Sequence, residues 1–208
     1  MNMKFVLAAS LTILSSAASA EVYLGVGGGI TRTNAAERLT QTFADYATVD
    51  KKDTSKGTYI LFGGYAFNKN FALEASYIDF GKYKASGHDA SGTSISDSLD
   101  AKAFSIGAVG SYPLGDSFSL DGKLGVGLVS QKYSCLDLAC SVLPEKTTKK
   151  AVIMGAIGAH WYFSKHVALR AAYEHFGGAD YEIERTDGTK FKKTADYGLL
   201  YAGAEARF

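Results

Sequence analysis

The sequence ends in the stretch Asp196-Tyr-Gly-Leu-Leu-Tyr-Ala-Gly-Ala-Glu-Ala-Arg-Phe208. Successive side chains of an extended strand point to opposite faces. One face of this strand therefore carries Leu200, Ala202, Ala204, Ala206 and Phe208, and the other carries Glu205 and Arg207. A strand that finishes on an exposed phenylalanine needs an apolar solvent on that side, and a lipid bilayer provides one.

Residues 1–20 have the layout of a secretory signal peptide. Met1-Asn-Met-Lys4 is a short positive region, residues 5–14 are apolar, and Ala18-Ser19-Ala20 offers a small-residue cleavage pattern. We therefore expect a mature chain that begins at Glu21. The apolar run is too short for a spanning helix, and no later segment reaches the length that one needs. Because no cysteine follows the cleavage site directly, a lipid-anchored start is not expected.

The composition favours a single all-β unit that does not bind nucleic acid. Removing Lys4 with the signal peptide leaves 21 basic and 21 acidic residues, so the mature chain is neutral when its histidines are uncharged. A neutral chain is a poor partner for a polyanion of the nucleic-acid type. The chain has 23 glycines, 13 tyrosines and 12 phenylalanines but only 2 prolines, which is typical of many closely packed strands. Its 47% apolar content excludes disorder.

The mature chain divides into eight segments with strand character, each long enough to cross a bilayer at a tilt. Their expected ranges are 22–31, 56–67, 71–80, 101–113, 118–133, 150–163, 167–176 and 195–208. These segments predict one domain, residues 21–208, folded as an eight-stranded antiparallel up-and-down transmembrane β-barrel.

The connections between these segments alternate in length. Residues 68–70, 114–117 and 164–166 form short turns, whereas the other four links are long and polar. Short turns at one end and long loops at the other are typical of outer-membrane barrels, and this layout places both termini on the periplasmic side. The Ser/Gly-rich link at 81–100 is expected to be a mobile loop.

Alternation within single strands supports the barrel. Leu169 and Tyr173, for example, lie on the face opposite Arg170 and Glu174. Aromatic residues also gather beside the short turns, namely Phe67, Phe71, Tyr112, Phe118, Trp161, Phe163 and Phe208. We interpret them as an aromatic girdle at the periplasmic interface. A soluble sandwich or lipocalin-like barrel is the alternative, but it explains neither the girdle nor the aromatic terminus.

Together with the signal peptide and the eight strands, the stretches Leu169-Arg-Ala-Ala-Tyr-Glu-His-Phe176 and Tyr201-Ala-Gly-Ala-Glu-Ala-Arg-Phe208 resemble a known family. This is the family of small outer membrane β-barrels that includes the transmembrane domain of outer membrane protein A and the opacity-type surface antigens. The resemblance implies a location in the Gram-negative outer membrane, periplasmic termini and four long extracellular loops. It also implies a C-terminal signal, ending at Phe208, for the barrel-assembly machinery. No peptidoglycan-binding domain is expected after this residue.

The charged residues on the other strand faces fall into one layer inside the predicted barrel. They are Glu74, Asp121, Lys123, His160, Arg170, Glu174, Glu205 and Arg207. Eight strands leave an interior just wide enough for side chains, so we expect these groups to pair across the lumen as a salt-bridged plug. Arg170 beside Glu205 is the pair that we expect most clearly. A functional gate is the alternative.

The sequence predicts no catalytic residue. Barrels of the lipid A deacylase family carry a His-x-Ser element in which the imidazole activates the hydroxyl. The matching stretch here is Tyr173-Glu174-His175-Phe176-Gly177, which has glycine in place of the nucleophile. His88 falls in a predicted loop and His166 in a turn, where solvated histidines are common. No pattern for a cofactor or a metal ion is present either.

Two cysteines, Cys135 and Cys140, fall in the third long link. A zinc site needs four nitrogen or sulfur ligands, and only two are close together here. Because the exported compartment is oxidising, we expect the two cysteines to form a disulfide.

The sequence therefore predicts a non-enzymatic outer-membrane surface barrel. Its expected partners are the lipid bilayer, lipopolysaccharide, the barrel-assembly machinery, and host or envelope proteins that contact the loops. A narrow porin-like channel for ions or small solutes is the first alternative, and an outer-membrane lipid hydrolase is the second. A closed network of charge pairs favours the plug, and a continuous wet lumen favours the channel.

Overall fold

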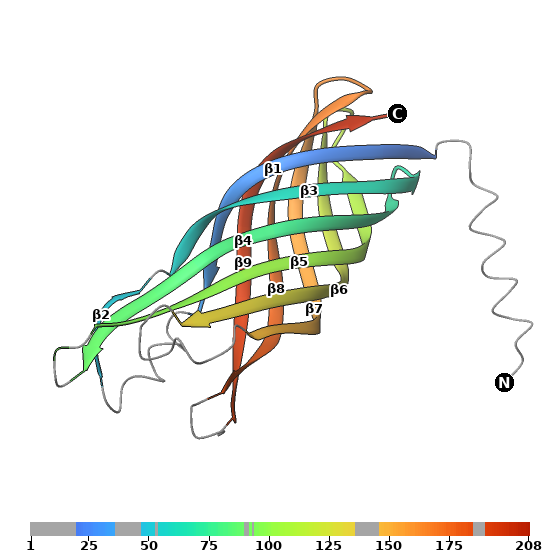
Figure 1. Cartoon of the computed structure of the whole chain (residues 1–208). Helices are drawn as coiled ribbons and strands as arrows, with labels where there is room; N and C mark the ends of the chain where they lie inside the picture. The colour runs from blue at the N-terminus through green and yellow to red at the C-terminus, as the bar shows by residue number, and fades with distance from the viewer. Residues whose placement is uncertain are drawn as a thin grey trace, which may run out of the picture.

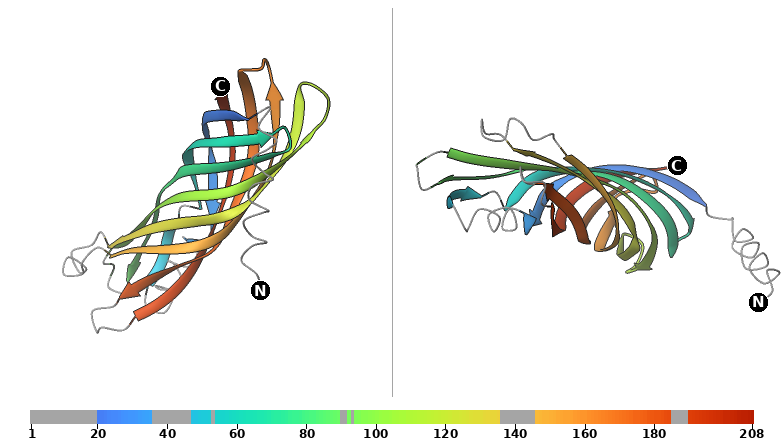
Figure 2. Two further views of the ribbon diagram at one scale, coloured as in Figure 1. Left: turned by 90° about the vertical axis from the view of Figure 1, so that its right-hand side faces the viewer. Right: turned by 60° about the horizontal axis from the view of Figure 1, so that its bottom comes forward.

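A single antiparallel sheet closes on itself in the computed structural model of this chain (Figure 1). The structure describes residues 20–35, 47–52, 54–89, 92, 94–135, 146–184 and 190–208. Its strands are β1 (Glu21–Thr33), β2 (Ala47–Lys52), β3 (Ser55–Asn68), β4 (Phe71–Asp89), β5 (Ser94–Pro113), β6 (Phe118–Cys135), β7 (Lys146–Tyr162), β8 (Val167–Glu184) and β9 (Lys190–Arg207). Two further views show these strands running obliquely, side by side (Figure 2).

Closure of the barrel comes from the pairing of its first and last strands. β1 pairs with β3 on one side and with β9 on the other, where Leu24 faces Ala206. β4 pairs with β5, and the remaining strands pair with their neighbours in sequence up to β9. The Phe208 amide donates to the Val22 carbonyl at 2.9 Å, so the two ends of the barrel chain meet. The predicted eight-stranded antiparallel barrel is confirmed.

The strand β2 was not predicted. It lies in the first long link and pairs with the outer end of β4, where Ala47 faces Asp89. It therefore lies beside the barrel wall and does not interrupt the ring of eight strands.

The prediction of a mobile loop at residues 81–100 was wrong. β4 continues to Asp89 and β5 begins at Ser94, and the two pair as one long hairpin. The physical reason lies in the alternation of the link itself, because Tyr83 and Ala85 are fully buried while Lys82 and Lys84 are exposed. The serine-rich composition of this link is typical of a loop, but its inward-facing residues fill the barrel as parts of β4 and β5.

The outer wall is apolar over most of its height. Leu24, Leu124, Ile153 and Ile157 are examples of large apolar side chains that are more than half exposed. Next to the short turns, six of the seven girdle residues are exposed, with Phe67 partly so. Such a surface would be unstable in water, and it matches the apolar band and aromatic girdle of a barrel in lipid.

Among the described residues, the structure contains no helix that is both long enough and apolar enough to span a membrane.

Candidate functional site in the barrel lumen

All eight predicted charged residues point into the barrel toward its periplasmic end. They come from five strands: Glu74 lies on β4, Asp121 and Lys123 on β6, His160 on β7, Arg170 and Glu174 on β8, and Glu205 and Arg207 on β9.

 Seven of the eight side chains are buried, and Arg207 is partly exposed at the periplasmic mouth. The alternation of each strand places them inside the barrel, because their neighbours in sequence face the lipid.

Glu74 is the centre of the first part of the layer. Its Oε2 accepts from Arg170 Nη1 at 2.6 Å and from the Tyr23 hydroxyl at 2.9 Å. Its Oε1 accepts from Lys123 Nζ at 3.0 Å. The carboxylate of Glu74 is only 1% exposed, and it accepts hydrogen bonds from two buried cations and one hydroxyl. Contacts of this kind offset the cost of removing charges from water only while every partner is present.

Lys123 extends this part of the network across the lumen. Its Nζ also lies 3.4 Å from Ser76 Oγ and 3.3 Å from Ser105 Oγ, and 3.9 Å from Glu174 Oε1. The Tyr201 hydroxyl donates to the same Glu174 oxygen at 3.2 Å. Hydroxyl groups thus complete the surroundings of the ammonium group, as buried charges require.

His160 is the centre of the second part of the layer. Its Nδ1 lies 2.6 Å from Asp121 Oδ2, and its Nε2 lies 3.1 Å from Glu205 Oε2. Both nitrogens donate only in the imidazolium form, so a charged His160 fits both contacts. Arg207 donates to Glu205 Oε1 at 3.0 Å and to Glu21 Oε2 at 2.9 Å. The second part therefore reaches from the lumen to the periplasmic mouth.

The expected direct pair of Arg170 with Glu205 was wrong. Arg170 faces Gly203 in the β8–β9 register, and its guanidinium extends across the lumen to Glu74. Glu205 is occupied by His160 and Arg207 instead. The adjacency of β8 and β9 suggested this pair. Inside a narrow barrel, however, a long side chain can reach a residue on the opposite wall as readily as one on the adjacent strand.

An apolar layer fills the extracellular half of the lumen, and sequence reasoning missed it. Phe80 is fully buried, stacks on Tyr197 with ring centroids 4.8 Å apart, and meets Phe176 edge-on at 5.5 Å. The other members of this layer share full burial, and they include Ile60, Ile78, Tyr83, Leu99, Met154 and Leu199. The signal that could have revealed it is the alternation of Tyr83 and Ala85 with exposed lysines.

The two layers meet at Arg170. Its guanidinium carbon lies 4.9 Å from the centroid of the Phe62 ring and 5.7 Å from that of Tyr201. The aromatic faces attract the cation and add to the contact with Glu74. A cavity of about 850 Å³ opens at the periplasmic mouth, where it is lined by Glu21, Tyr162 and Arg207 among others. It lies below the layer centred on Glu74.

The histidines outside the charged layer lie at the surface. His175 is exposed on the outer wall, and Gly177 two residues later offers no hydroxyl. His88 lies on β4 and not in a loop, where its Nδ1 is 3.0 Å from Asp50 Oδ2. His166 lies in its predicted turn, with Nδ1 3.2 Å from the Arg207 carbonyl oxygen. Neither of these two contacts joins an imidazole to a serine or threonine hydroxyl.

Two predicted features lie outside what the structure describes. Cys140 is outside the described residues, and Cys135 ends β6 with a side chain that is not described. The disulfide therefore stays a prediction. The signal peptide also stays a prediction, because residues 1–19 lie outside the described residues.

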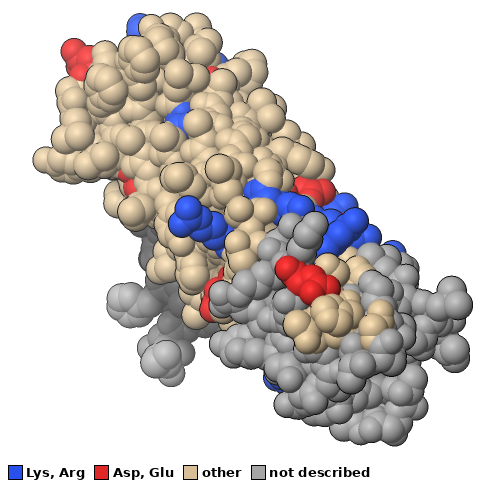
Figure 3. Space-filling view, turned by 90° about the vertical axis from the view of Figure 1, so that its left-hand side faces the viewer, with Lys and Arg blue, Asp and Glu red and all other residues tan. Residues whose placement is uncertain are grey.

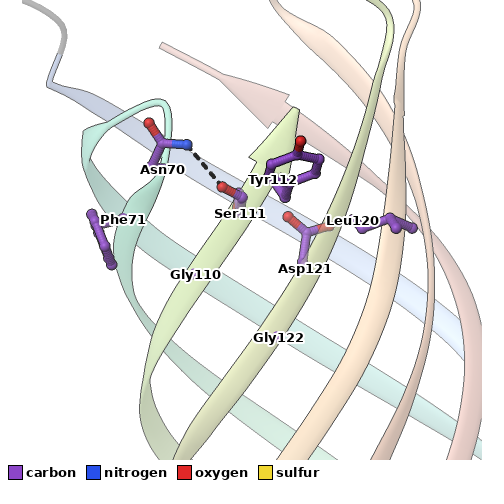
Figure 4. A pocket seen from close by; sticks show the side chains of 8 residues that line it. All are labelled: Asn70, Phe71, Gly110, Ser111, Tyr112, Leu120, Asp121 and Gly122. Carbon is purple, nitrogen blue, oxygen red and sulfur yellow. Dashed lines mark hydrogen bonds between the residues drawn. The ribbon is translucent and has the colours of Figure 1, made fainter. Parts of the chain in front are cut away.

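A shallow pocket of about 470 Å³ lies on the outer wall, near the periplasmic turns (Figure 4). Gly110 of β5 and Gly122 of β6 face each other there, and neither would bring a Cβ near another residue. Asn70 Nδ2 donates to the Ser111 carbonyl at 3.0 Å at its edge. Because the pocket faces the apolar band between Phe71 and Leu120, it is a notch in the lipid-facing wall.

Comparisons with known proteins agree with this architecture. The family model described as "OmpA-like transmembrane domain" matches residues 17–207. Outer membrane protein P5 of Haemophilus influenzae is 28% identical over 159 residues, which cover 73% of this chain and 44% of that protein. The chain thus spans less than half the length of this relative.

Solved structures of other outer-membrane barrels are similar in fold, and two of them serve as examples. The outer membrane protein OprG of Pseudomonas aeruginosa superposes with a TM-score of 0.63 at 13% identity, covering 92% of this chain and 96% of OprG. Ail, the attachment invasion locus protein of Yersinia pestis, was solved in complex with the heparin analogue sucrose octasulfate. It superposes with a TM-score of 0.50 at 17% identity, covering 91% of this chain and 99% of Ail. At these identities the likeness shows a shared fold.

Proposed function

The chain belongs to the OmpA-like transmembrane domain family, and we propose that it is a non-conducting surface barrel whose loops bind lipopolysaccharide, host surfaces or other envelope components. The fold and the location of the protein do not depend on this proposal. The protein is an outer-membrane β-barrel of the Gram-negative type, in contact with the lipid bilayer. Barrels of this family are typically not enzymes.

The filled lumen is the observation that supports the proposal. In the described part of the chain, the layer centred on Glu74 and the layer centred on Phe80 follow each other along the barrel axis. An ion would have to break buried charge pairs in the first layer and then cross an apolar layer without water. A filled barrel leaves the outer surface and the loops as the parts that can meet a partner.

The complex of Ail supports a binding role for the surface. That barrel was solved in complex with the heparin analogue sucrose octasulfate, which is a polyanion. In this chain the long hairpin of β4 and β5 is a candidate for such a binding surface. Loops positioned by a rigid barrel are common sites of recognition.

Export and assembly complete the proposal. Residues 1–20 direct the chain out of the cytoplasm, and the C-terminal strand ending at Phe208 addresses it to the barrel-assembly machinery. Phe208 is 74% exposed on the lipid-facing side of the barrel end, which supports a role in recognition before insertion. Cys135 and Cys140 pair in the oxidising exterior, so a maleimide reagent should label them only after reduction.

Planar-bilayer recordings test the closed lumen. We expect purified, refolded barrel to add no conductance above that of the bare bilayer. Regular single-channel steps from the unmodified protein would instead support the channel.

Epitope insertion tests the orientation of the loops. Gly92 and Gly115 both have positive φ angles, of 80° and 87°, and both lie in open space between paired strands. An epitope inserted after Gly92 should bind antibody on intact cells. The matched insertion after Gly115 should bind only after the outer membrane is permeabilised. The reverse result would contradict the proposed orientation.

A further inference from the structure

The outer face of strands β4 to β7 changes character over three successive rows of paired residues. The first row is apolar or aromatic, with Tyr77, Phe104, Leu128 and Ala151 opposite one another. The next row contains Asp79, Lys102, Ser130 and Lys149, and the row beyond it contains Lys82, Asp100, Lys132 and Thr147. Along each strand, the change from an apolar or aromatic side chain to a charged or hydroxyl side chain takes place within two residues.

Aromatic side chains mark the boundary on the extracellular side. Tyr59 and Tyr77 have ring centroids 6.4 Å apart, and the Tyr59 hydroxyl donates to Asp79 Oδ2 at 3.2 Å. Tyr59, Tyr77 and Phe104 are each more than one third exposed. Tyrosines with the ring in an apolar band and the hydroxyl toward polar groups are typical of a membrane interface. The charged rows therefore lie at the level of the lipid headgroups.

Lysines dominate these charged rows. We name as the lysine belt the four lysines of these rows together with Lys84, which lies two residues beyond Lys82 on β4; its members, all exposed, are Lys82, Lys84, Lys102, Lys132 and Lys149. Two aspartates, Asp79 and Asp100, share the same rows. Lys102 Nζ lies 3.5 Å from Asp79 Oδ2, and the five lysines outnumber the two aspartates. Figure 3 shows one face where Lys and Arg side chains gather between a mostly uncharged surface and the residues drawn in grey.

The wall formed by β8, β9 and β1 is different at the same height. Asp180 of β8 lies 2.9 Å from Lys192 Nζ and accepts from Thr194. Asp196 of β9 accepts from the Gly178 amide at 2.8 Å and from Asn34. Among the side chains described on that wall, Asp180 and Asp196 are balanced by Arg32 and Lys192, so the basic excess lies on the β4 to β7 face.

We propose that the lysine belt binds the phosphate groups of a phosphorylated glycolipid headgroup in the outer leaflet, of the lipopolysaccharide class. The inference deepens the proposed function, and it rests on the extracellular placement of the loops. Lysine stems lie along the apolar wall while their ammonium groups reach the headgroups. Ser130 and Thr147, in the same two rows, offer hydroxyls to phosphate or sugar oxygens. The acyl chains of such a lipid lie against the row of Tyr77, Phe104 and Leu128.

Titration calorimetry on the full-length barrel in micelles tests the belt. The variant is K82Q/K149Q, and the matched control is K69Q/K165Q, which removes two exposed lysines from the short turns at the other end. The probes are bisphosphorylated lipid A, its dephosphorylated form, phosphatidylglycerol and inorganic phosphate. Heat-modifiable migration on a gel confirms that every variant has folded.

Bisphosphorylated lipid A should bind the unmodified barrel and the control equally. Because a basic side chain near an anionic surface contributes a factor of about five, we expect the K82Q/K149Q variant to bind roughly thirtyfold more weakly. Removing the phosphates from lipid A should weaken binding to the unmodified barrel, and the variant should distinguish the two forms of lipid A much less.

Three results would overturn the proposal. The first is that removing the phosphates from lipid A weakens binding to the variant as much as to the unmodified barrel. The second is that phosphatidylglycerol binds the unmodified barrel as tightly as lipid A does, and the third is that inorganic phosphate at the same concentration as lipid A fully displaces it. The test in micelles does not depend on which side of the membrane the loops occupy. Failure of the epitope experiment would therefore reject the proposed function, whereas failure of this titration alone would reject the lysine belt.

Discussion

The two halves of the lumen are filled by different chemistry. The periplasmic half contains charges that depend on one another, with Glu74 accepting from Arg170, Lys123 and Tyr23. The extracellular half contains rings and aliphatic side chains such as Phe80, which depend on shape. Removing one partner from the first half leaves a buried charge without compensation, whereas removing one ring from the second leaves a cavity. The comparison shows that one narrow barrel can be closed by either means.

The largest expected effect is that of Glu74→Ala. This change leaves the guanidinium of Arg170 and the ammonium of Lys123 buried without their shortest contacts. We expect the free energy of unfolding to fall by roughly 3 to 5 kcal/mol. Urea unfolding in phospholipid vesicles, followed by the fluorescence of Trp161, the single tryptophan, measures it. Ser76→Ala at the same level is the control, and a loss no larger than that of the control would show that Glu74 is not the centre of the layer.

Phe80→Ala breaks the other half. The change removes a ring that contacts Tyr197 and Phe176 and leaves a cavity in the apolar layer. We expect a loss of about 3 kcal/mol that does not change with salt, because no charge is involved. The same unfolding assay applies, with Phe104→Ala on the outer wall as the control for loss of a ring. If the loss of unfolding free energy for Phe80→Ala changed with salt, the apolar half would not differ from the charged half in the way described.

A double-mutant cycle sharpens the description of the charged half. Arg170→Ala and Glu74→Ala should show a coupling of about 1 to 3 kcal/mol, since they remove the two ends of one contact. Arg170→Ala and Glu205→Ala should be closer to additive, because His160 and Arg207 are the partners of Glu205. If Arg170 were coupled more strongly to Glu205 than to Glu74, the pair expected from the adjacency of β8 and β9 would be correct after all.

The smallest expected effect concerns the extracellular ends of the strands. Hydrogen bonds from Lys192 and Thr194 hold the pKa of Asp180 below its ordinary value. A lowered pKa contributes stability above the ordinary carboxyl range, and that stability is lost as the pH falls through the folded value. Asp180→Asn should therefore slightly reduce the acid sensitivity of unfolding below about pH 4. An unchanged acid profile would mean that the contact with Lys192 adds nothing in solution.

The sequence by itself determined the barrel. Alternation such as that of Leu169 and Tyr173 against Arg170 and Glu174 has a period of two, and it divides lipid-facing from lumen-facing residues without reference to any partner strand. The short turns at 68–70, 114–117 and 164–166 then fixed which strands are neighbours. Both signals are local, so they can be recognised in the sequence without knowing which strands pair.

Only the tertiary structure decided which charges meet. The partner of Arg170 depends on how far its side chain reaches across the closed barrel, and Glu74 is 96 residues away in sequence. The apolar half of the lumen was missed for a similar reason, because the serine-rich segment before Leu99 pairs as a strand with β4, and its composition does not show that pairing. The inward direction of a side chain is a property of one strand, but its contacts depend on the diameter of the ring that all eight strands form together.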